Sequence, residues 1–374
     1  MSVTAPAGFT AGGVAAGQGG DGAPDLALVV NEGPARAAAG VFTRHPVQSA
    51  PVLWSAQVLR GGTVGAVLLD AANAHACTGP SGFQAVHAIV ERAARAAGRN
   101  AAEVAFAATG RIGVPASLEV LLPAVDRVAE EAHEFGGERA AQALAPAPAP
   151  PVTAAVRGDG WTVGGMVAAA GPYGPAPTTS LVVLTTDAEL PAPALERALR
   201  PAVAAGFDRL GARPAAAPGD TALLLASGAA ERAPDEAEFA DAVGRLRAEL
   251  ARRLVRGAPG ATKEIRIEVT GAATEADALA VGRAVAGDAP LRHAIHREDP
   301  DWGRIVATLG ATDAVFAPHR LTVTLGGVRV CHDGVADVGA AVDLRFREVA
   351  IAVGLGAGAC SATVWTTDLP AAAG

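Results

Sequence analysis

The chain has 374 residues, half of them apolar and only 4% aromatic, with a formal net charge of −8. Because a single core stops growing at roughly 250 to 300 residues, this length predicts two lobes. The negative charge, without any dense run of Lys and Arg, argues against a nucleic-acid partner, since phosphate binding needs clustered cations.

Cysteine usage and hydropathy indicate the compartment. Cys77, Cys331 and Cys360 lie far apart and form no CxxC pair, which predicts a reducing environment. Residues 1–20 contain no basic leader followed by an apolar stretch, and no run of about 18 strongly apolar residues follows. We therefore expect a cytoplasmic protein that is neither exported nor inserted in a membrane.

In the first half of the chain, runs of Val, Leu and Phe between turn residues predict buried strands. These strands are expected at 25–30, 63–69, 104–108 and 180–186. Apolar stripes at helical spacing predict helices over 81–98, with Ser81 as the cap, and over 118–134. The tract APAPAPPV at 145–152 predicts an extended connection.

The second half continues the mixture of helices and strands, which predicts an α/β protein. Helices are expected over 193–207, 235–256 and 275–286, and strands over 264–269, 321–325 and 362–365. The segment EDPDWGR at 298–304 is expected to be a polar turn that carries a single Trp.

Gly354, Gly356 and Ala359 fit the dinucleotide-binding pattern G-x-G-x-x-A. That fingerprint opens a helix and is followed some twenty residues later by an acidic residue. Here the next segment, 361–366, has the composition of a strand, and the sequence ends soon afterwards. We interpret the glycines as a turn before a strand and expect no nucleotide cofactor.

Two pairs of potential ligands or nucleophiles have simpler interpretations. His293 and His296 have no third ligand at a fixed spacing, so we expect a polar helix end and no metal site. We interpret the segment that holds His75 and Cys77 as a strand, and no third catalytic group can be named for the pair. A structural role is expected for both.

The hydroxyl cluster Thr178, Thr179 and Ser180 precedes a predicted buried strand and follows a Pro- and Gly-rich segment. N-terminal-threonine enzymes place their nucleophile in this way, because chain cleavage frees an α-amine that acts as its base. Threonine is also common at strand starts because of its β propensity. The residues alone leave both interpretations open.

A series of segments, in the same order along nearly the whole chain, resembles the ornithine acetyltransferase (glutamate N-acetyltransferase) family. The segments are MSVTAPAGFTAGGVAAG at the start, LALVVNEGPARAAAGVFTR at 26–44, NAHACTG at 73–79, TGRIGV at 109–114, TALLLASG at 221–228, GATK at 260–263, DPDWGRI at 299–305 and VWTTDL at 364–369. The resemblance implies the family's layered αββα fold with a second, smaller C-terminal lobe. It also implies a homo-oligomer, or a heterotetramer of cleaved fragments.

The family's precursor cleaves itself before a threonine, and that threonine carries the acyl group. The segment VGGMVAAAGPYGPAPTTSL at 163–181 aligns without a gap with the family's cleavage segment. The resemblance implies that Thr179 is the nucleophile and Thr178 the residue before the cut, giving an N-terminal region 1–178 and a C-terminal region 179–374. Thr109 and Gly110 match the pair that forms the family's oxyanion hole.

Several family positions that contact substrate have changed. Ala168 stands where the family has a lysine, Ala147 lies where it has a threonine-bearing segment, and Pro259 replaces a glutamate. The stretch RPAAAPGD at 213–220 keeps only the final acid of its family counterpart, and the family's substrate-gripping tail is expected to be missing after Gly374. Each lost charge-assisted contact is worth about 1.5–3 kcal/mol.

The resemblance therefore implies an acyltransferase that moves an acetyl or other acyl group through acyl-Thr179 to an amine acceptor, as in arginine biosynthesis. Acetyl-CoA or an N-acetyl amino acid would be the donor, and no bound cofactor is expected. The lost contacts predict altered specificity, toward a less polar or larger acceptor. The alternatives are a non-catalytic paralogue that keeps the fold for binding or assembly, and a conventional arginine-pathway enzyme.

Overall fold

The computed structural model describes residues 2–18, 22–145, 149–168, 181–206 and 217–368. They divide into two compact units, the first up to Gly257 and the smaller second unit from Ala258 onward. The expected two lobes are confirmed. Each unit has a hydrophobic core of its own.

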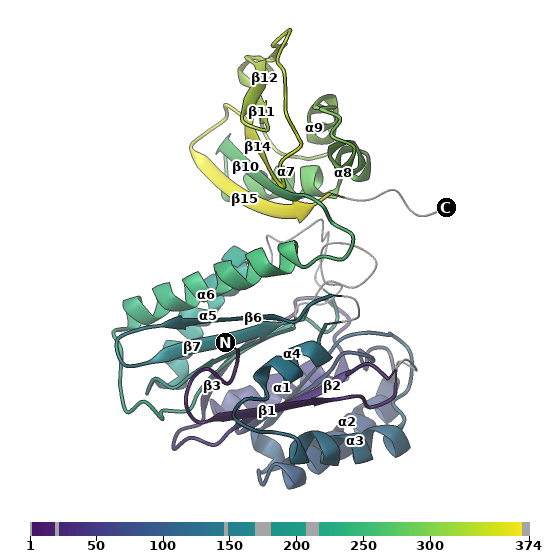
Figure 1. Cartoon of the computed structure of the whole chain (residues 1–374), viewed down its shortest axis with the longest axis vertical. Coiled ribbons are helices and arrows are strands. Elements are labelled where there is room, and N and C mark those ends of the chain that lie inside the picture. The colour runs from purple at the N-terminus through teal and green to yellow at the C-terminus, as the bar shows by residue number, and fades with distance from the viewer. Residues whose placement is uncertain (1, 19–21, 146–148, 169–180, 207–216, 369–374) are drawn as a thin grey trace. The chain divides into compact units, whose positions relative to one another are not determined.

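Two β-sheets form the middle of the first unit (Figure 1). Their orders are β1-β2-β4-β5 and β3-β9-β8-β7-β6. The strands are β1 (Phe9–Val14), β2 (Leu26–Asn31), β3 (Ala37–Phe42), β4 (Ala66–Asp70), β5 (Val104–Ala108), β6 (Val152–Arg157), β7 (Thr162–Val167), β8 (Leu181–Thr186) and β9 (Thr221–Ala226). β4 runs parallel to β5, and β8 parallel to β9.

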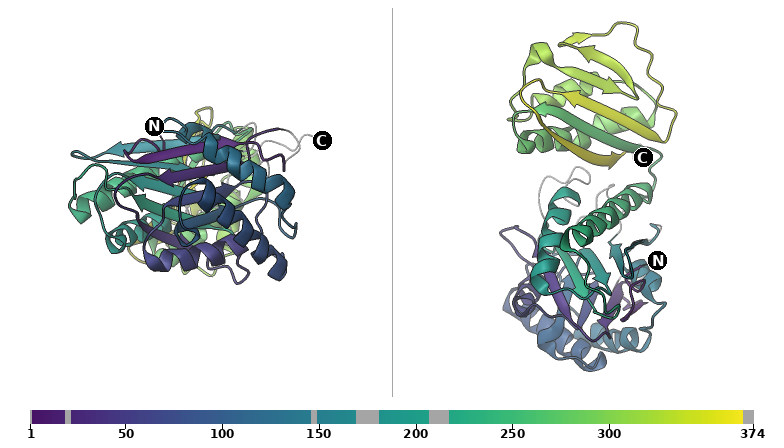
Figure 2. Two further views of the ribbon diagram at one scale, coloured as in Figure 1. Left: turned by 90° about the horizontal axis from the view of Figure 1, so that it is seen from below. Right: turned by 90° about the vertical axis from the view of Figure 1, so that its left-hand side faces the viewer.

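Helices cover the outer faces of both sheets (Figures 1 and 2). α2 and α3 pack on the four-stranded sheet, and α5 and α6 on the five-stranded sheet. α1 contacts the edge strands β5 and β3, whereas α4 contacts the edge strands β1 and β6. The helices are α1 (Ala50–Val58), α2 (Gly79–Ala96), α3 (Leu118–Glu130), α4 (Gly137–Ala143), α5 (Ala192–Gly206) and α6 (Glu236–Arg256), with 3-10 turns η1 (Leu59–Gly61) and η2 (Ala101–Glu103). The implied αββα layering is confirmed.

The alternation of side chains along each strand explains why the sheets need cover on both faces. In β4, Val67 and Leu69 point into the core between the sheets, which also contains Leu223 and Leu225 of β9. Leu68 points the other way, into the core beneath α2 and α3. A strand that is buried on both faces has a continuous apolar sequence, as the short runs predicted.

The second unit is a six-stranded sheet with helices on one face (Figures 1 and 2). Its order is β13-β12-β11-β14-β10-β15. The strands are β10 (Glu264–Ala272), β11 (Thr322–Leu325), β12 (Val328–His332), β13 (Val335–Ala336), β14 (Glu348–Gly354) and β15 (Cys360–Thr367), and the helical elements are α7 (Glu275–Gly287), α8 (Ala289–His296), α9 (Gly303–Leu309) and the 3-10 turn η4 (Pro318–Arg320). Ile267 of β10 and Val281 of α7 share its buried core.

Several details differ from the sequence-based predictions. α2 begins at Gly79, so Thr78 is the N-cap residue, and Ser81 instead donates its hydroxyl hydrogen to the Thr78 carbonyl oxygen. α9 begins at Gly303, inside the expected turn 298–304. The structure also contains elements that were not predicted: β1, β3, β6, β7, β9, β12, β13, β14, α1 and α4.

The glycines around Gly354 lie in a connection between two strands. β14 ends at Gly354, and β15 begins at Cys360 on the far side of β10. The backbone N–H groups of Ala357 and Gly358 donate to the Gly271 carbonyl oxygen, which fixes the crossing. The turn-and-strand interpretation is confirmed. Separately, no helix in the described part of the chain is long and apolar enough to cross a membrane.

Candidate active site

Thr109 and Gly110 directly follow β5, at the edge of the sheet where β4 and β5 both end. The parallel register pairs Asp70 with Ala108, so the loops after these two strands leave the sheet together. Thr109 is half-buried and Gly110 is exposed. The turn thus lies at the carboxyl edge of a parallel strand pair, a common location for ligand sites in α/β folds.

The conformation of Gly110 requires glycine. Its φ is +116°, in a region that residues with a side chain rarely adopt. A Cβ atom there would lie 2.3 Å from the carbonyl oxygen of Ala72 and 2.8 Å from the nitrogen of Asn73. Only glycine allows the turn to approach the loop after β4 this closely.

Two hydrogen-bond donors of this turn have no partner among the described residues. The backbone N–H of Thr109 donates to the Asp70 carbonyl oxygen at 2.8 Å, so it is already used. Across the residues that the structure describes, neither the Thr109 hydroxyl nor the Gly110 N–H has a hydrogen-bond partner. A hydroxyl and an N–H on adjacent residues can hold the oxygen of a tetrahedral intermediate.

The loop after β4 supports this turn through backbone hydrogen bonds. The N–H of Arg111 donates to the Ala72 carbonyl oxygen at 3.1 Å, and the N–H of Ala74 donates to the Arg111 carbonyl oxygen at 3.0 Å. The N–H of Gly113 donates to the Ala76 carbonyl oxygen at 2.9 Å. The segments 73–79 and 109–114, both family-like in sequence, therefore lie side by side.

His75 and Cys77 belong to the same loop but do not act as a pair. His75 is buried, and its Nε2 donates to Asp70 Oδ2 at 2.9 Å, whereas Cys77 is exposed. Both residues have left-handed backbone conformations, with φ of 48° and 57°. The assumption that they occupy a strand was wrong, but the contact of His75 with Asp70 agrees with a structural role.

The start of β8 lies at the same end of the first unit as the Thr109–Gly110 turn. At the beginning of α1, Ala50 N–H donates to the carbonyl oxygen of His75, and Ser49 N–H donates to that of Pro218. Pro218 precedes β9, whose first residue, Thr221, pairs with Leu181 of β8. α1 therefore links the loop beneath the turn to the beginning of the two central strands.

The remaining predicted site residues are only partly described. Thr178, Thr179 and Ala147 lie outside the described residues. Ala168 follows β7 and is buried in the core between the sheets, with its N–H donating to the Leu181 carbonyl oxygen at 2.9 Å. Pro259 is half-buried in a turn of the second unit. The structure thus brings Thr109 and Gly110 together with β4 and α1, but adds no cation or carboxylate at Ala168 or Pro259.

Asp70 is a buried residue next to this turn that sequence reasoning missed. Its side chain is fully buried, and it accepts hydrogen bonds from the N–H groups of Ala72 and Asn73. An aspartate at the end of an apolar run was the available signal. Its partners could not be inferred from spacing, because the left-handed residues fold the following loop back onto the carboxylate.

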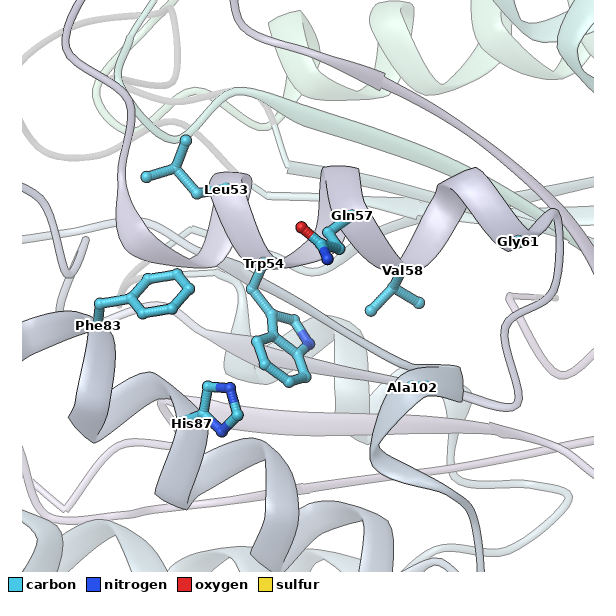
Figure 3. A pocket seen from close by; sticks show the side chains of 8 residues that line it. All are labelled: Leu53, Trp54, Gln57, Val58, Gly61, Phe83, His87 and Ala102. Atoms are coloured by element: carbon cyan, nitrogen blue, oxygen red, sulfur yellow. The ribbon is translucent and has the colours of Figure 1, made fainter.

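A separate pocket of about 600 Å³ lies between α1 and α2 (Figure 3). It is lined by Leu53, Trp54, Gln57, Val58, Gly61, Phe83, His87 and Ala102. Trp54 and His87 meet edge to face, with ring centroids 4.5 Å apart, and the Trp54 indole N–H donates to the Val104 carbonyl oxygen. None of the predicted site residues that the structure describes lines this pocket.

A polar cluster in the second unit surrounds Asp368. The carboxylate accepts hydrogen bonds from the Thr262 hydroxyl at 2.5 Å, from His296 Nδ1 at 2.6 Å and from the backbone N–H groups of Thr262 and Lys263 at 2.9 Å. His296 ends α8, which confirms the expected helix end for the pair His293 and His296. The segments GATK and VWTTDL are thus joined through one carboxylate.

Burial alone would raise the pKa of Asp368, but its hydrogen bonds outweigh burial and lower the pKa below the ordinary value of 3.8. The donors are the Thr262 hydroxyl, His296 and two backbone N–H groups. A carboxyl whose pKa is lower in the folded than in the unfolded state stabilises the fold above the unfolded pKa. That contribution is lost as the pH falls through the folded pKa.

We therefore expect Asp368→Asn to lower the free energy of unfolding at pH 7 by about 1.5–3 kcal/mol. The reason is that the NH2 group of the asparagine side chain would face hydrogen-bond donors and could not accept from them. Urea denaturation of the wild-type protein and of the variant measures this loss. The difference between their free energies of unfolding should shrink below pH 3.8. Asp343→Asn is the control: the pKa of Asp343 is about 2 because of Arg345, but the pair is exposed and contributes little. Equal destabilisation by both substitutions would contradict the assignment.

Comparisons with known proteins agree with the segments quoted above. A family model described as the ArgJ family matches residues 10–372. The chain is 53% identical to the arginine biosynthesis bifunctional protein ArgJ 1 of Streptomyces clavuligerus and 46% identical to ArgJ of Thermobifida fusca, in each case over 99% of this chain and 97% of the relative. A crystal structure of ornithine acetyltransferase complexed with ornithine from Mycobacterium tuberculosis is 46% identical, covers 48% of this chain and 95% of that chain, and has a TM-score of 0.45.

Proposed function

The chain belongs to the ArgJ family and is an acyl-transferring enzyme, and from this premise we propose that Thr179 carries the acyl group while Thr109 and Gly110 hold the oxyanion. The observation that carries this proposal is the pair of available donors, the Thr109 hydroxyl and the Gly110 N–H, at the end of the unit where β8 begins. Thr179 precedes the first residue of β8 by two positions in the chain.

Activation requires cleavage of the bond between Thr178 and Thr179. The Thr179 hydroxyl attacks the Thr178 carbonyl carbon, the peptide C–N bond breaks, and water hydrolyses the resulting ester. This leaves a carboxyl on Thr178 and a free α-amine on Thr179. β7 and β8, which flank the cut in sequence, are hydrogen-bonded neighbours in one sheet, so the two fragments would remain associated after cleavage.

In the transfer, the α-amine of Thr179 takes the proton of the Thr179 hydroxyl as the oxygen attacks the donor's acyl carbon. The Thr109 hydroxyl and the Gly110 N–H stabilise the developing oxyanion, and the bond from the acyl carbon to the donor breaks as the leaving group takes the proton. An acceptor amine then attacks the ester, takes the acyl group and returns a proton to the Thr179 oxygen. No metal or bound cofactor takes part in these steps.

We propose further that the acceptor is less polar or larger than glutamate or ornithine. Ala168 presents a methyl group in an apolar environment, and Pro259 cannot supply a carboxylate, so two charged family contacts are replaced by neutral groups. The relatives carry the name of arginine-biosynthesis proteins, which supports an amino-acid-like amine as the acceptor.

A panel of acceptor amines tests this specificity, with N-acetylornithine as the acyl donor and product formation measured by mass spectrometry. We expect kcat/KM for amines with uncharged side chains to exceed that for glutamate by about tenfold or more, since one lost charge-assisted contact corresponds to at least that factor. A clear preference for glutamate would identify a conventional arginine-pathway enzyme. Absence of any acyl adduct on the protein would favour a non-catalytic paralogue.

A further inference from the structure

We infer that Asp70 and His75 are positioning residues that hold the Thr109–Gly110 turn in its donor geometry, an inference that rests on the proposed function. Asp70 reaches the turn in two ways. Its backbone carbonyl oxygen accepts from Thr109 N–H at 2.8 Å, and its buried carboxylate organises the loop on which Gly110 lies.

The two carboxylate oxygens of Asp70 accept hydrogen bonds from different donors. Oδ1 accepts from Ala72 N–H at 2.8 Å, from Asn73 N–H at 3.1 Å and from the Gln18 side-chain amide at 3.1 Å, while Oδ2 accepts from His75 Nε2 at 2.9 Å. A buried carboxylate is costly unless hydrogen bonds compensate it, so four donors converging on one group form a rigid unit.

The same two loop residues, Ala72 and Asn73, form the surface against Gly110. A Cβ atom on Gly110 would meet the Ala72 carbonyl oxygen at 2.3 Å and the Asn73 nitrogen at 2.8 Å. A displacement of this part of the loop therefore moves the Gly110 N–H directly. Misplacement of a reacting or stabilising group by about 1 Å can reduce the rate about a hundredfold.

His75 connects the Asp70 carboxylate to β5 and α1. Its side chain is 1% exposed, meets the ring of Phe106 in β5 at 5.2 Å, and donates to Asp70. Its carbonyl oxygen accepts from Ala50 N–H at the start of α1. His75 thus fixes the carboxylate relative to both β5 and α1, without reaching the turn itself.

The test compares His75→Leu, which removes the donor to Asp70, with His75→Gln, whose amide N–H can replace Nε2. For the cleaved enzyme, we expect His75→Leu to lower kcat by about 10- to 100-fold with KM within about twofold of wild type. His75→Gln should recover most of the lost rate. The control is Asp187→Asn, because Asp187 is a buried carboxylate that accepts from the N–H groups of Ala7 and Thr162 beyond the other end of β8.

Asp187→Asn should reduce stability and leave kcat near the wild-type value. A second readout does not depend on activity: amide hydrogen exchange at Ala74 and Arg111 should accelerate in His75→Leu and stay unchanged in Asp187→Asn. Wild-type kcat and unchanged exchange in His75→Leu would overturn the inference while leaving the proposed function intact. If the wild-type protein forms no acyl adduct, the proposed function fails, and the exchange measurement still decides whether His75 and Asp70 hold the turn.

Discussion

Replacement of Thr179 by alanine is expected to abolish acyl transfer. Without the hydroxyl, no acyl ester can form, and loss of the nucleophile in an enzyme of this kind costs on the order of a million-fold in kcat. Cleavage should be lost as well, because the same oxygen attacks the Thr178 carbonyl carbon. Intact mass after incubation with N-acetylornithine measures both effects in one experiment.

Two neighbouring hydroxyls provide controls for this substitution. Ser180→Ala removes an adjacent hydroxyl and should retain both cleavage and the acyl adduct, whereas Thr179→Ser keeps a nucleophilic oxygen and should retain part of each. An acyl adduct on the Thr179→Ala protein, or normal cleavage of it, would show that another residue is the nucleophile.

The second large effect is expected for Gly110→Ala. The added Cβ would lie 2.3 Å from the Ala72 carbonyl oxygen, and φ of +116° is strained for alanine, so the turn must move. The Gly110 N–H then no longer points at the oxyanion. Loss of one such donor lowers kcat by about 100- to 1,000-fold, which steady-state kinetics would detect at unchanged KM.

Gly113→Ala is the matched control for backbone strain. Gly113 lies in the same loop with φ of +77°, but a Cβ there meets no atom within 4 Å. The Gly113→Ala variant should therefore lose stability, as other strained substitutions do, while its kcat stays close to the wild-type value. Equal loss of kcat in both variants would mean that strain in the loop, and not the Gly110 donor, controls the rate.

Much of the fold could be predicted because short apolar runs and amphipathic stripes are local signals. β5 has the predicted bounds, Val104–Ala108, since all five of its residues are buried. α6 begins after its cap, Asp235, whose side chain accepts from two backbone N–H groups. β7 was missed because Gly164 and Gly165 interrupt its apolar pattern; a Cβ on Gly164 would meet the Ser2 carbonyl oxygen at 2.2 Å, so close packing explains that glycine.

The candidate site was less accessible to prediction. Thr109 and Gly110 were identified through family resemblance and not through spacing, since a Thr-Gly pair after a strand is common in turns. The Asp70–His75 contact depends on left-handed backbone at His75, which alternation patterns do not reveal.

The predicted division at residues 178 and 179 describes a cut in the chain, whereas the two compact units meet in sequence at Gly257 and Ala258. That division stays a prediction.

The central claim is that Thr179 becomes a free N-terminus and carries the acyl group. Intact mass spectrometry of the purified wild-type protein, before and after addition of N-acetylornithine, tests it most directly. We predict two fragments corresponding to 1–178 and 179–374, with one acetyl group added to the second fragment at its first residue. A single uncleaved chain of 374 residues, or an acetyl group located elsewhere, would contradict the claim.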